Sequence, residues 1–146
     1  MTSSVLDVKR ITTTDPKTVE EINSLLDEGK AWDEKEGLLF LADKDNAMFL
    51  AYWNNEVSGF LTAHRLQRFD DRKAEILLHE MGVKEEFRKK GIGKALIEAV
   101  KAWGREVQAD EVWVLTNRSN EAAMALYKSA GGLEASVDDT MFVFKL

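Results

Sequence analysis

Hydrophobic and polar positions alternate with a period of two in several parts of the chain, which predicts β-strands. Turn residues separate the segments, among them Asn54-Asn55 and Asp70-Asp71. Because the last three segments follow one another with only short turns between them, we expect an antiparallel meander. The predicted strands are residues 5–11, 48–53, 57–68 and 74–83.

Helical spacing replaces this alternation in four places. Asp15 and Pro16 form a helix start, with Asp15 as N-cap, and a second short helix is predicted over residues 34–42. Ile92, Leu96, Val100, Trp103 and Val107 fall on one face of a longer helix. A fourth helix is predicted over residues 120–130, ended by Gly131-Gly132.

The remaining apolar segments complete the expected sheet. Residues 111–116 read as a short buried strand, and 133–137 and 140–146 read as closing strands. A helix links residues 74–83 to 111–116, and helical crossovers join parallel strands, so this pair is expected to be parallel. The pattern predicts a mixed α/β sheet with helices on its faces.

Length and composition narrow the protein class. We expect one domain over residues 1–146, since 146 residues favour a single unit with its own core. The chain has no cysteine, no secretory pattern at its start and no apolar run near ~20 residues. These features predict a soluble cytoplasmic protein without a metal, and the net charge of −6 argues against nucleic-acid and membrane partners.

A basic, glycine-containing loop stands between a predicted strand and a predicted helix. Gly91 and Gly93 allow close backbone approach to a ligand, and the following helix offers free N–H groups to an anion. ATP or GTP would require Ser or Thr after Lys94, where Ala95 stands, and a dinucleotide fingerprint would require glycine at Leu96. Coenzyme A pyrophosphate or a plain basic turn are the two readings left. The basic side chains are Arg88, Lys89, Lys90 and Lys94.

Three motifs in order resemble the GNAT N-acyltransferase superfamily. They are the strand end Glu80-Met81-Gly82-Val83, the loop from Arg88 to Gly93, and the helix Asn120-x-x-Ala123-x-x-x-Tyr127. The resemblance covers nearly the whole chain. It implies a mixed, mostly antiparallel central sheet, splayed at its middle and flanked by helices on both faces. It also implies acetyl-CoA as the donor. The residues that would bind it are Met81, Gly82, Val83, the loop and helix start Arg88, Lys89, Lys90, Gly91, Ile92, Gly93 and Lys94, and Asn120, Ala123 and Tyr127.

Within that superfamily, the chain is most similar to the type I aminoglycoside 3-N-acetyltransferases. The residues behind this similarity are 67–70, 75–80 and 95–97, although His79 and Glu80 replace the usual aromatic residue and Asp. The resemblance implies acetylation of the 3-amino group of an aminoglycoside, hence antibiotic resistance. Other amines remain alternatives (a polyamine, an amino acid or a protein N-terminus), as does a non-catalytic acyl-CoA-binding module. A homodimer is a further implication.

Glu80 is the candidate catalytic base. An ammonium has a pKa near ~10, so the acceptor must lose a proton before it attacks a thioester. Glu80 ends the central strand beside the loop, where it can accept that proton directly or through water; a solvated glutamate is the alternative. Strand alternation predicts that His79 faces the opposite side, as a core or supporting residue, and that His64 is structural.

The resemblance implies two further roles. A backbone N–H near Met81 would stabilise the oxyanion, and Tyr127 would protonate the leaving thiolate. For Tyr127 the alternative is core packing, and for Asn120 it is helix capping. Acidic residues are candidates for binding a cationic acceptor, with solvated turns as their alternative; they are Asp33, Glu34, Asp70, Asp71, Glu80, Asp138 and Asp139.

Overall fold

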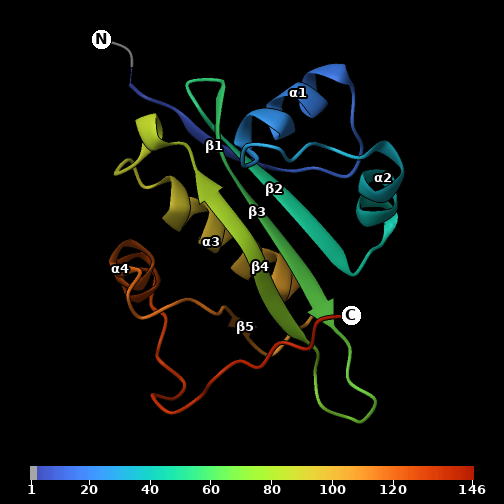
Figure 1. The fold of residues 1–146 in the computed structure, drawn as a ribbon, viewed down its shortest axis with the longest axis vertical. Helices are drawn as coiled ribbons and strands as arrows, with labels where there is room; N and C mark the ends of the chain where they lie inside the picture. Colours follow the sequence, from blue (N-terminus) through green and yellow to red (C-terminus); the bar gives the residue numbers. More distant parts are fainter. Residues whose placement is uncertain (1–2) are drawn as a thin grey trace.

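A five-stranded sheet forms the centre of the molecule (Figure 1). The computed structural model describes residues 3–146. The strands lie side by side in chain order, and the first four are antiparallel neighbours, while β5 runs parallel to β4. This confirms the predicted meander and parallel pair. The strands are β1 (Leu6–Arg10), β2 (Asn46–Trp53), β3 (Glu56–Leu66), β4 (Glu75–Val83) and β5 (Val112–Trp113).

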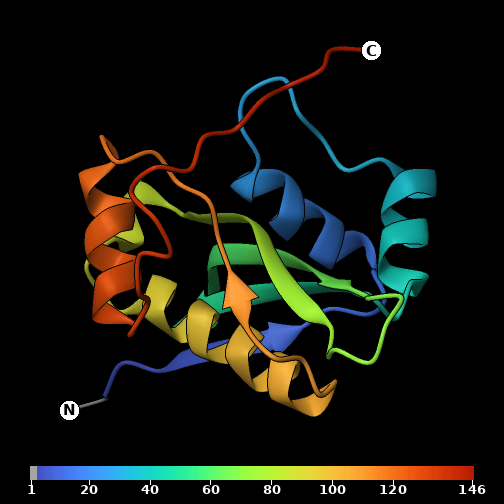
Figure 2. The ribbon, with the colours of Figure 1, turned by 90° about the horizontal axis from the view of Figure 1, so that it is seen from below.

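Helices cover both faces of the sheet, as expected (Figure 2). On one side lie α1 (Pro16–Leu25) and α2 (Glu34–Ala42), which begin at the capping carboxylates of Asp15 and Asp33. On the other side lies α3 (Ile92–Glu106), which follows the short 3-10 helix η1 (Glu85–Phe87). The last helix, α4 (Glu121–Ser129), contacts α3.

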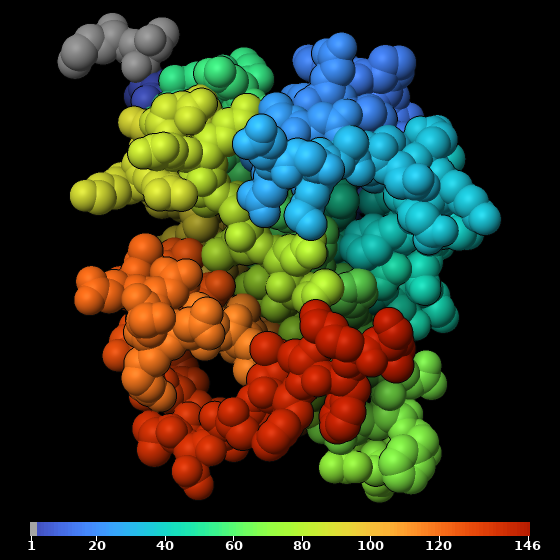
Figure 3. All heavy atoms as spheres, in the orientation of Figure 1, coloured from blue at the N-terminus to red at the C-terminus, as the bar shows by residue number. Residues whose placement is uncertain are grey.

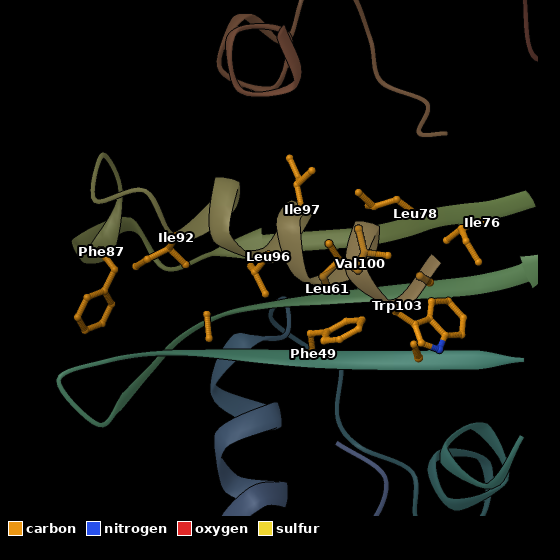
Figure 4. Packing of buried hydrophobic residues seen from close by; sticks show 13 residues of the cluster. Phe49, Leu61, Ile76, Leu78, Phe87, Ile92, Leu96, Ile97, Val100 and Trp103 are labelled. Carbon is orange, nitrogen blue, oxygen red and sulfur yellow. The ribbon is translucent and has the colours of Figure 1, made fainter. Parts of the chain in front are cut away.

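The main core fills the space between the sheet and α3 (Figure 4). Leu96 and Val100 of α3 are fully buried against Leu61 of β3 and Ile76 of β4. Because side chains alternate along a strand, the residues beside these core positions face α1 and α2 instead. Leu50 and Thr62 are such residues, and both contact the α1 side. The sheet therefore has one face packed on α3 and another, the α1/α2 face, that bears α1 and α2.

A β-bulge in β4 breaks that alternation at His79. Ala63 of β3 pairs with Leu78, and the next residue back, Thr62, pairs with Glu80, so His79 has no partner across the ladder. The extra residue places His79 and Glu80 on the same face. The prediction that they face opposite sides is therefore wrong, and so is the expectation of a core position for His79, which is exposed.

The sheet opens between β4 and β5. Only Ile76 and Leu77 of β4 pair with β5, at Val112 and Trp113. From Leu78 to Val83 the β4 edge has no strand beside it in the described chain. This is the splay that the resemblance implied, and it explains why β5 is shorter than the predicted strand over residues 111–116.

The closing strands predicted over residues 133–137 and 140–146 do not form. This C-terminal segment is irregular and exposed, although it carries Val137, Phe142 and Phe144. Alternation indicates a preference for strand structure, but a strand needs an edge to pair with, and β5 offers only two residues. Among residues 3–146, no helix is both long and apolar enough to cross a bilayer.

Candidate functional site

The basic loop leads into the N-terminus of α3. Gly91 is the N-cap residue and adopts φ 81°, in the left-handed region that glycine enters without strain. The first backbone hydrogen bond of α3 runs from the Ala95 N–H to the Gly91 carbonyl, 3.0 Å away. The N–H groups of the intervening residues 92–94 therefore have no intrahelical acceptor, and they point with the positive end of the helix dipole toward the loop.

The side chains of this loop are exposed and cationic. Arg88, Lys89, Lys90 and Lys94 all reach solvent, and the Lys90 ammonium lies 5.1 Å from the centre of the Trp53 ring. Such a helix end combines hydrogen-bond donors with positive charge, which suits a phosphate or pyrophosphate. The structure thus brings together residues 88–94, the anion-binding segment expected from the sequence.

Close backbone packing holds the β4 edge against α3. A Cβ atom on Gly59 would stand 2.9 Å from the Gly82 carbonyl oxygen and 3.2 Å from Ile92 Cγ2. A Cβ atom on Gly82 would stand 2.9 Å from the Phe60 ring. A larger residue at Gly59 would push the end of β4, which carries Met81, Gly82 and Val83, away from the start of α3, whereas one at Gly82 would displace the Phe60 ring. Gly59 therefore keeps the strand end and the start of α3 next to each other.

Glu80 lies on the α1/α2 face, where it lines a cavity of about 60 Å³ together with Thr62. The two residues are direct partners across the β3–β4 ladder. The rest of the wall is apolar and comes from α1, the residue after it, β2 and β3: Ile22, Leu25, Leu26, Met48, Leu50 and Phe60. Figure 3 shows the middle of β4 at the surface, between the segment after α1 (light blue) and the C-terminal segment (red).

Two histidines lie beside Glu80. The His64 and His79 ring centres are 5.3 Å apart, and His64 Nδ1 is 2.8 Å from Asn46 Oδ1. The Asn46 amide nitrogen donates to the Phe40 carbonyl at 3.2 Å, so its oxygen is the atom that faces His64. His64 Nδ1 must then carry the proton. Burial, and then the charge of His79, lower the pKa of His64, against the opposing effect of Glu80 and Asp43.

Tyr127 lies at a different cavity. It lines a space of about 300 Å³ between α3, β5 and α4, with Leu78, Ile97 and Val112 among the other walls. Burial raises the pKa of its phenol, so the hydroxyl stays protonated at neutral pH. None of the residues that line the cavity at Glu80 also lines this second cavity. The structure therefore does not bring Tyr127 and Glu80 into one cavity.

Asn120 and several of the candidate acidic residues have structural partners. Asn120 Oδ1 accepts from the Ala123 N–H at 3.1 Å and caps α4, and Asp33 Oδ1 caps α2 through the Glu36 N–H at 2.8 Å. Glu34 accepts from Trp32 Nε1 at 3.0 Å. Hydrogen bonds from Arg72 hold the pKa of Asp70 below its ordinary value. Asp71 is exposed after β3, and Asp138 and Asp139 are exposed on the C-terminal segment.

Comparison with known proteins decides the family. Residues 16–131 match the Acetyltransferase (GNAT) family. The chain belongs to the GNAT acetyltransferases. A curated relative of this GNAT protein is the N-alpha-acetyltransferase of Sulfurisphaera tokodaii, which is 33% identical over 104 residues. That match covers 66% of this chain and 62% of the relative, so the chain matches less than two thirds of the relative's length.

Solved structures show the same fold. An aminoglycoside acetyltransferase, meta-AAC0020, from an uncultured soil metagenomic sample superposes with a TM-score of 0.82 at 22% identity, over 96% of this chain and 97% of the other. AAC(6')-Iy, solved with a CoA-acetylneamine bisubstrate analogue, superposes with a TM-score of 0.81 at 23% identity, over 97% and 99%. These likenesses establish the GNAT fold for this chain.

Sequence reasoning missed one residue of the cavity at Glu80. Thr62 lies opposite Glu80, yet in the sequence it stands in an apolar strand, between Leu61 and Ala63, without any motif. The only available signal was a hydroxyl at a position facing away from the α3 core. Among the described residues, no cluster of His, Asp and Glu side chains has the arrangement of a metal site.

Proposed function

We propose that this GNAT protein transfers the acetyl group of acetyl-CoA to a primary amine by direct attack. The observation that carries the proposal is the cationic, free N-terminus of α3, which follows β4 after η1 and the basic loop, together with the β4 edge that β5 leaves unpaired. A donor with a pyrophosphate and an extended arm matches those two features together. The chain has no cysteine that could form an acyl-enzyme, which favours direct attack.

The donor fits the residues of the loop. The N–H groups of Ile92, Gly93 and Lys94 would hold the pyrophosphate oxygens, and Arg88, Lys89 and Lys90 would neutralise their charge. At the unpaired edge of β4, backbone groups near Met81, Gly82 and Val83 would hold the arm and stabilise the oxyanion. We assign Asn120 and Ala123, at the start of α4, to the wall of the same site. Asn120 would contribute by capping α4 through the Ala123 N–H.

Two side chains would move protons. Glu80 would accept a proton from the acceptor ammonium, and the neutral nitrogen would then form the new C–N bond. As the C–S bond breaks, the Tyr127 hydroxyl, which is protonated at neutral pH, would donate its proton to the departing thiolate. Since Tyr127 and Glu80 line different cavities, the reacting groups would bridge them across the β4 edge.

For the acceptor, we propose an amino group of an aminoglycoside. The segment between α1 and α2 borders the opening above Glu80. It ends at Asp33, and Glu34 follows as the first residue of α2, so that both carboxylates would attract a polycation. Asp70, Asp138 and Asp139 would add to this field from farther away. The sequence resemblance implies the 3-amino group as the position that is acetylated. The structural neighbour AAC(6')-Iy is instead named for the 6' position.

A protein N-terminus is the second candidate acceptor. The curated relative is an N-alpha-acetyltransferase, and the cavity at Glu80 has an apolar wall that suits an uncharged first side chain better than a sugar hydroxyl. The two acceptors therefore differ in what they would place beside Leu25 and Phe60.

A single acceptor panel tests the proposal. The purified chain is incubated with acetyl-CoA and sisomicin, a short unblocked peptide, spermidine or a free amino acid, and thiol release and product mass are measured. Turnover of sisomicin supports the aminoglycoside, and NMR of the product then identifies the acetylated position. Turnover of the peptide alone selects the second candidate. Acetyl-CoA binding without turnover of any amine would leave a non-catalytic binding module and overturn the proposal.

A further inference from the structure

Thr62 has a buried hydroxyl without a protein partner. The residue is 6% exposed, and its Oγ1 makes no hydrogen bond within the described chain. A buried, unpaired hydroxyl is costly, and most buried polar groups in folded proteins find a partner. Thr62 lines the same cavity as Glu80 and lies directly across the ladder from it.

The same strand shows how the fold treats a hydroxyl that is only structural. Ser58 of β3 is fully buried, and its Oγ donates to the Ala51 carbonyl at 3.1 Å. Thr62 lies four residues farther along β3 and lacks such an acceptor. No protein group in the described chain therefore satisfies the Thr62 hydroxyl.

The cavity has room for a small polar molecule, and only two side chains on its wall can bind one. Its volume is about 60 Å³, and a cavity can hold a water molecule once this volume exceeds roughly 10–15 Å³. Every lining residue other than Thr62 and Glu80 is apolar. A water in such a site requires at least two polar partners, and Thr62 and Glu80 are the two polar side chains that the neighbouring strands β3 and β4 provide.

We propose that Thr62 is a positioning residue, whose hydroxyl and the Glu80 carboxylate hold between them the water that deprotonates the acceptor amine. This proposal rests on the proposed acetyl transfer. The water accepts a proton from the ammonium and gives one of its own protons to Glu80, so that the amine becomes neutral and Glu80 becomes protonated. The Thr62 hydroxyl fixes the water by accepting from it or donating to it.

Two variants at Thr62 separate the hydroxyl from the shape of the side chain. Thr62→Val keeps the shape and removes the hydroxyl, and we expect kcat to fall about 10- to 100-fold. The KM for acetyl-CoA is expected to change less than about twofold, because the donor binds elsewhere. Thr62→Ser restores a hydroxyl and is expected to recover most of kcat.

A matched control comes from Ser58. Ser58→Ala also removes a buried hydroxyl from β3, but one that is already bonded, so it should lower the thermal unfolding midpoint and leave kcat unchanged. Thr62→Val should leave that midpoint unchanged or raise it, since it removes an unpaired polar group. Unchanged kcat in Thr62→Val, or a kcat loss that Thr62→Ser does not reverse, would overturn the proposal.

A second readout does not depend on turnover. High-resolution crystal structures of the wild type and of Thr62→Val are compared at the cavity. A water bonded to both Thr62 Oγ1 and Glu80 in the wild type, and missing from the variant, supports the water site itself even if the acceptor panel fails, in which case only the proton transfer is lost with the proposed function. A wild-type cavity without such a water overturns it, whatever amine is acetylated.

Discussion

The centres of the His64 and His79 rings lie 5.3 Å apart on the α1/α2 face of the sheet, and their planes are tilted by 56°. His79 reaches this position because it is the extra residue of the β4 bulge. The pair places ionisable rings next to Glu80, on the face that holds α1 and α2. One of the two rings, His64, is half-buried and held by Asn46.

This arrangement predicts that stability falls in mild acid. The pKa of His64 is lowered in the folded protein, so the unfolded chain binds a proton first as the pH drops. The contribution of His64 is fully present above its unfolded pKa of ~6.5 and is lost as the pH falls toward its folded pKa. Urea unfolding at several pH values between neutrality and mild acid measures the slope.

The control for this prediction is His64→Gln, which retains an amide that can bond Asn46 but cannot titrate in this range. Its unfolding free energy should vary less with pH than that of the wild type. Identical pH dependence in the two proteins would remove His64 as the cause.

Replacement of Glu80 by Gln should affect chemistry and spare donor binding. The amide has almost the same shape but cannot accept the ammonium proton, so we expect kcat to fall about 10²- to 10⁴-fold. Acetyl-CoA affinity, measured by calorimetry, should stay as in the wild type. Glu98→Gln, on the exposed side of α3, serves as control and should show wild-type kinetics in both respects.

Tyr127→Phe tests the proton donor. The ring keeps its packing, so the unfolding midpoint should change little, while kcat should fall about 10- to 100-fold if the hydroxyl protonates the thiolate. The loss should be smaller with acyl donors whose leaving thiol is more acidic, because a weaker base needs less help to leave. A Phe variant with wild-type kcat would assign Tyr127 to packing alone.

Gly91→Ala should weaken both the fold and the donor site. The residue has φ 81°, where an L side chain costs about 1–2 kcal/mol, although no atom lies within 4 Å of the added Cβ. Gly29 has nearly the same conformation, φ 82°, also with open space around it, and lies in the segment between α1 and α2. Gly29→Ala should therefore lose similar stability in urea unfolding.

The two glycine variants should differ in acetyl-CoA affinity. Only Gly91→Ala changes the backbone from which the free N–H groups of α3 emerge, so only this variant should raise the dissociation constant. Equal acetyl-CoA affinities in Gly91→Ala, Gly29→Ala and the wild type would show that the donor does not bind at this loop.

Features with local causes were predictable from the sequence. The cap of α1 at Asp15, the span of α2 and the glycine loop before α3 each depend on a few neighbouring residues, and all three agree with the structure. The meander followed from strand segments joined by short turns. The family assignment followed from motifs in register.

Features that depend on pairing between strands were not predictable. Nothing near His79 in the sequence indicates that β3 skips it, since a bulge is a property of the ladder. The role of Thr62 as the partner of Glu80 has the same origin. The closing strands failed for a related reason, because residues 140–146 have strand-like composition but β5 offers too short an edge.

The exposed C-terminal segment affects how the purified protein responds to proteases and how readily it associates. Met141, Phe142, Val143 and Phe144 are each more than half exposed, in a stretch without regular structure. Chymotrypsin cleaves after such residues when the backbone is accessible, so brief digestion should shorten the chain from this end before it cuts α3 or the sheet. Because these exposed residues are apolar, concentrated samples are prone to associate. Low protein concentrations and an affinity tag at the N-terminus are therefore favoured.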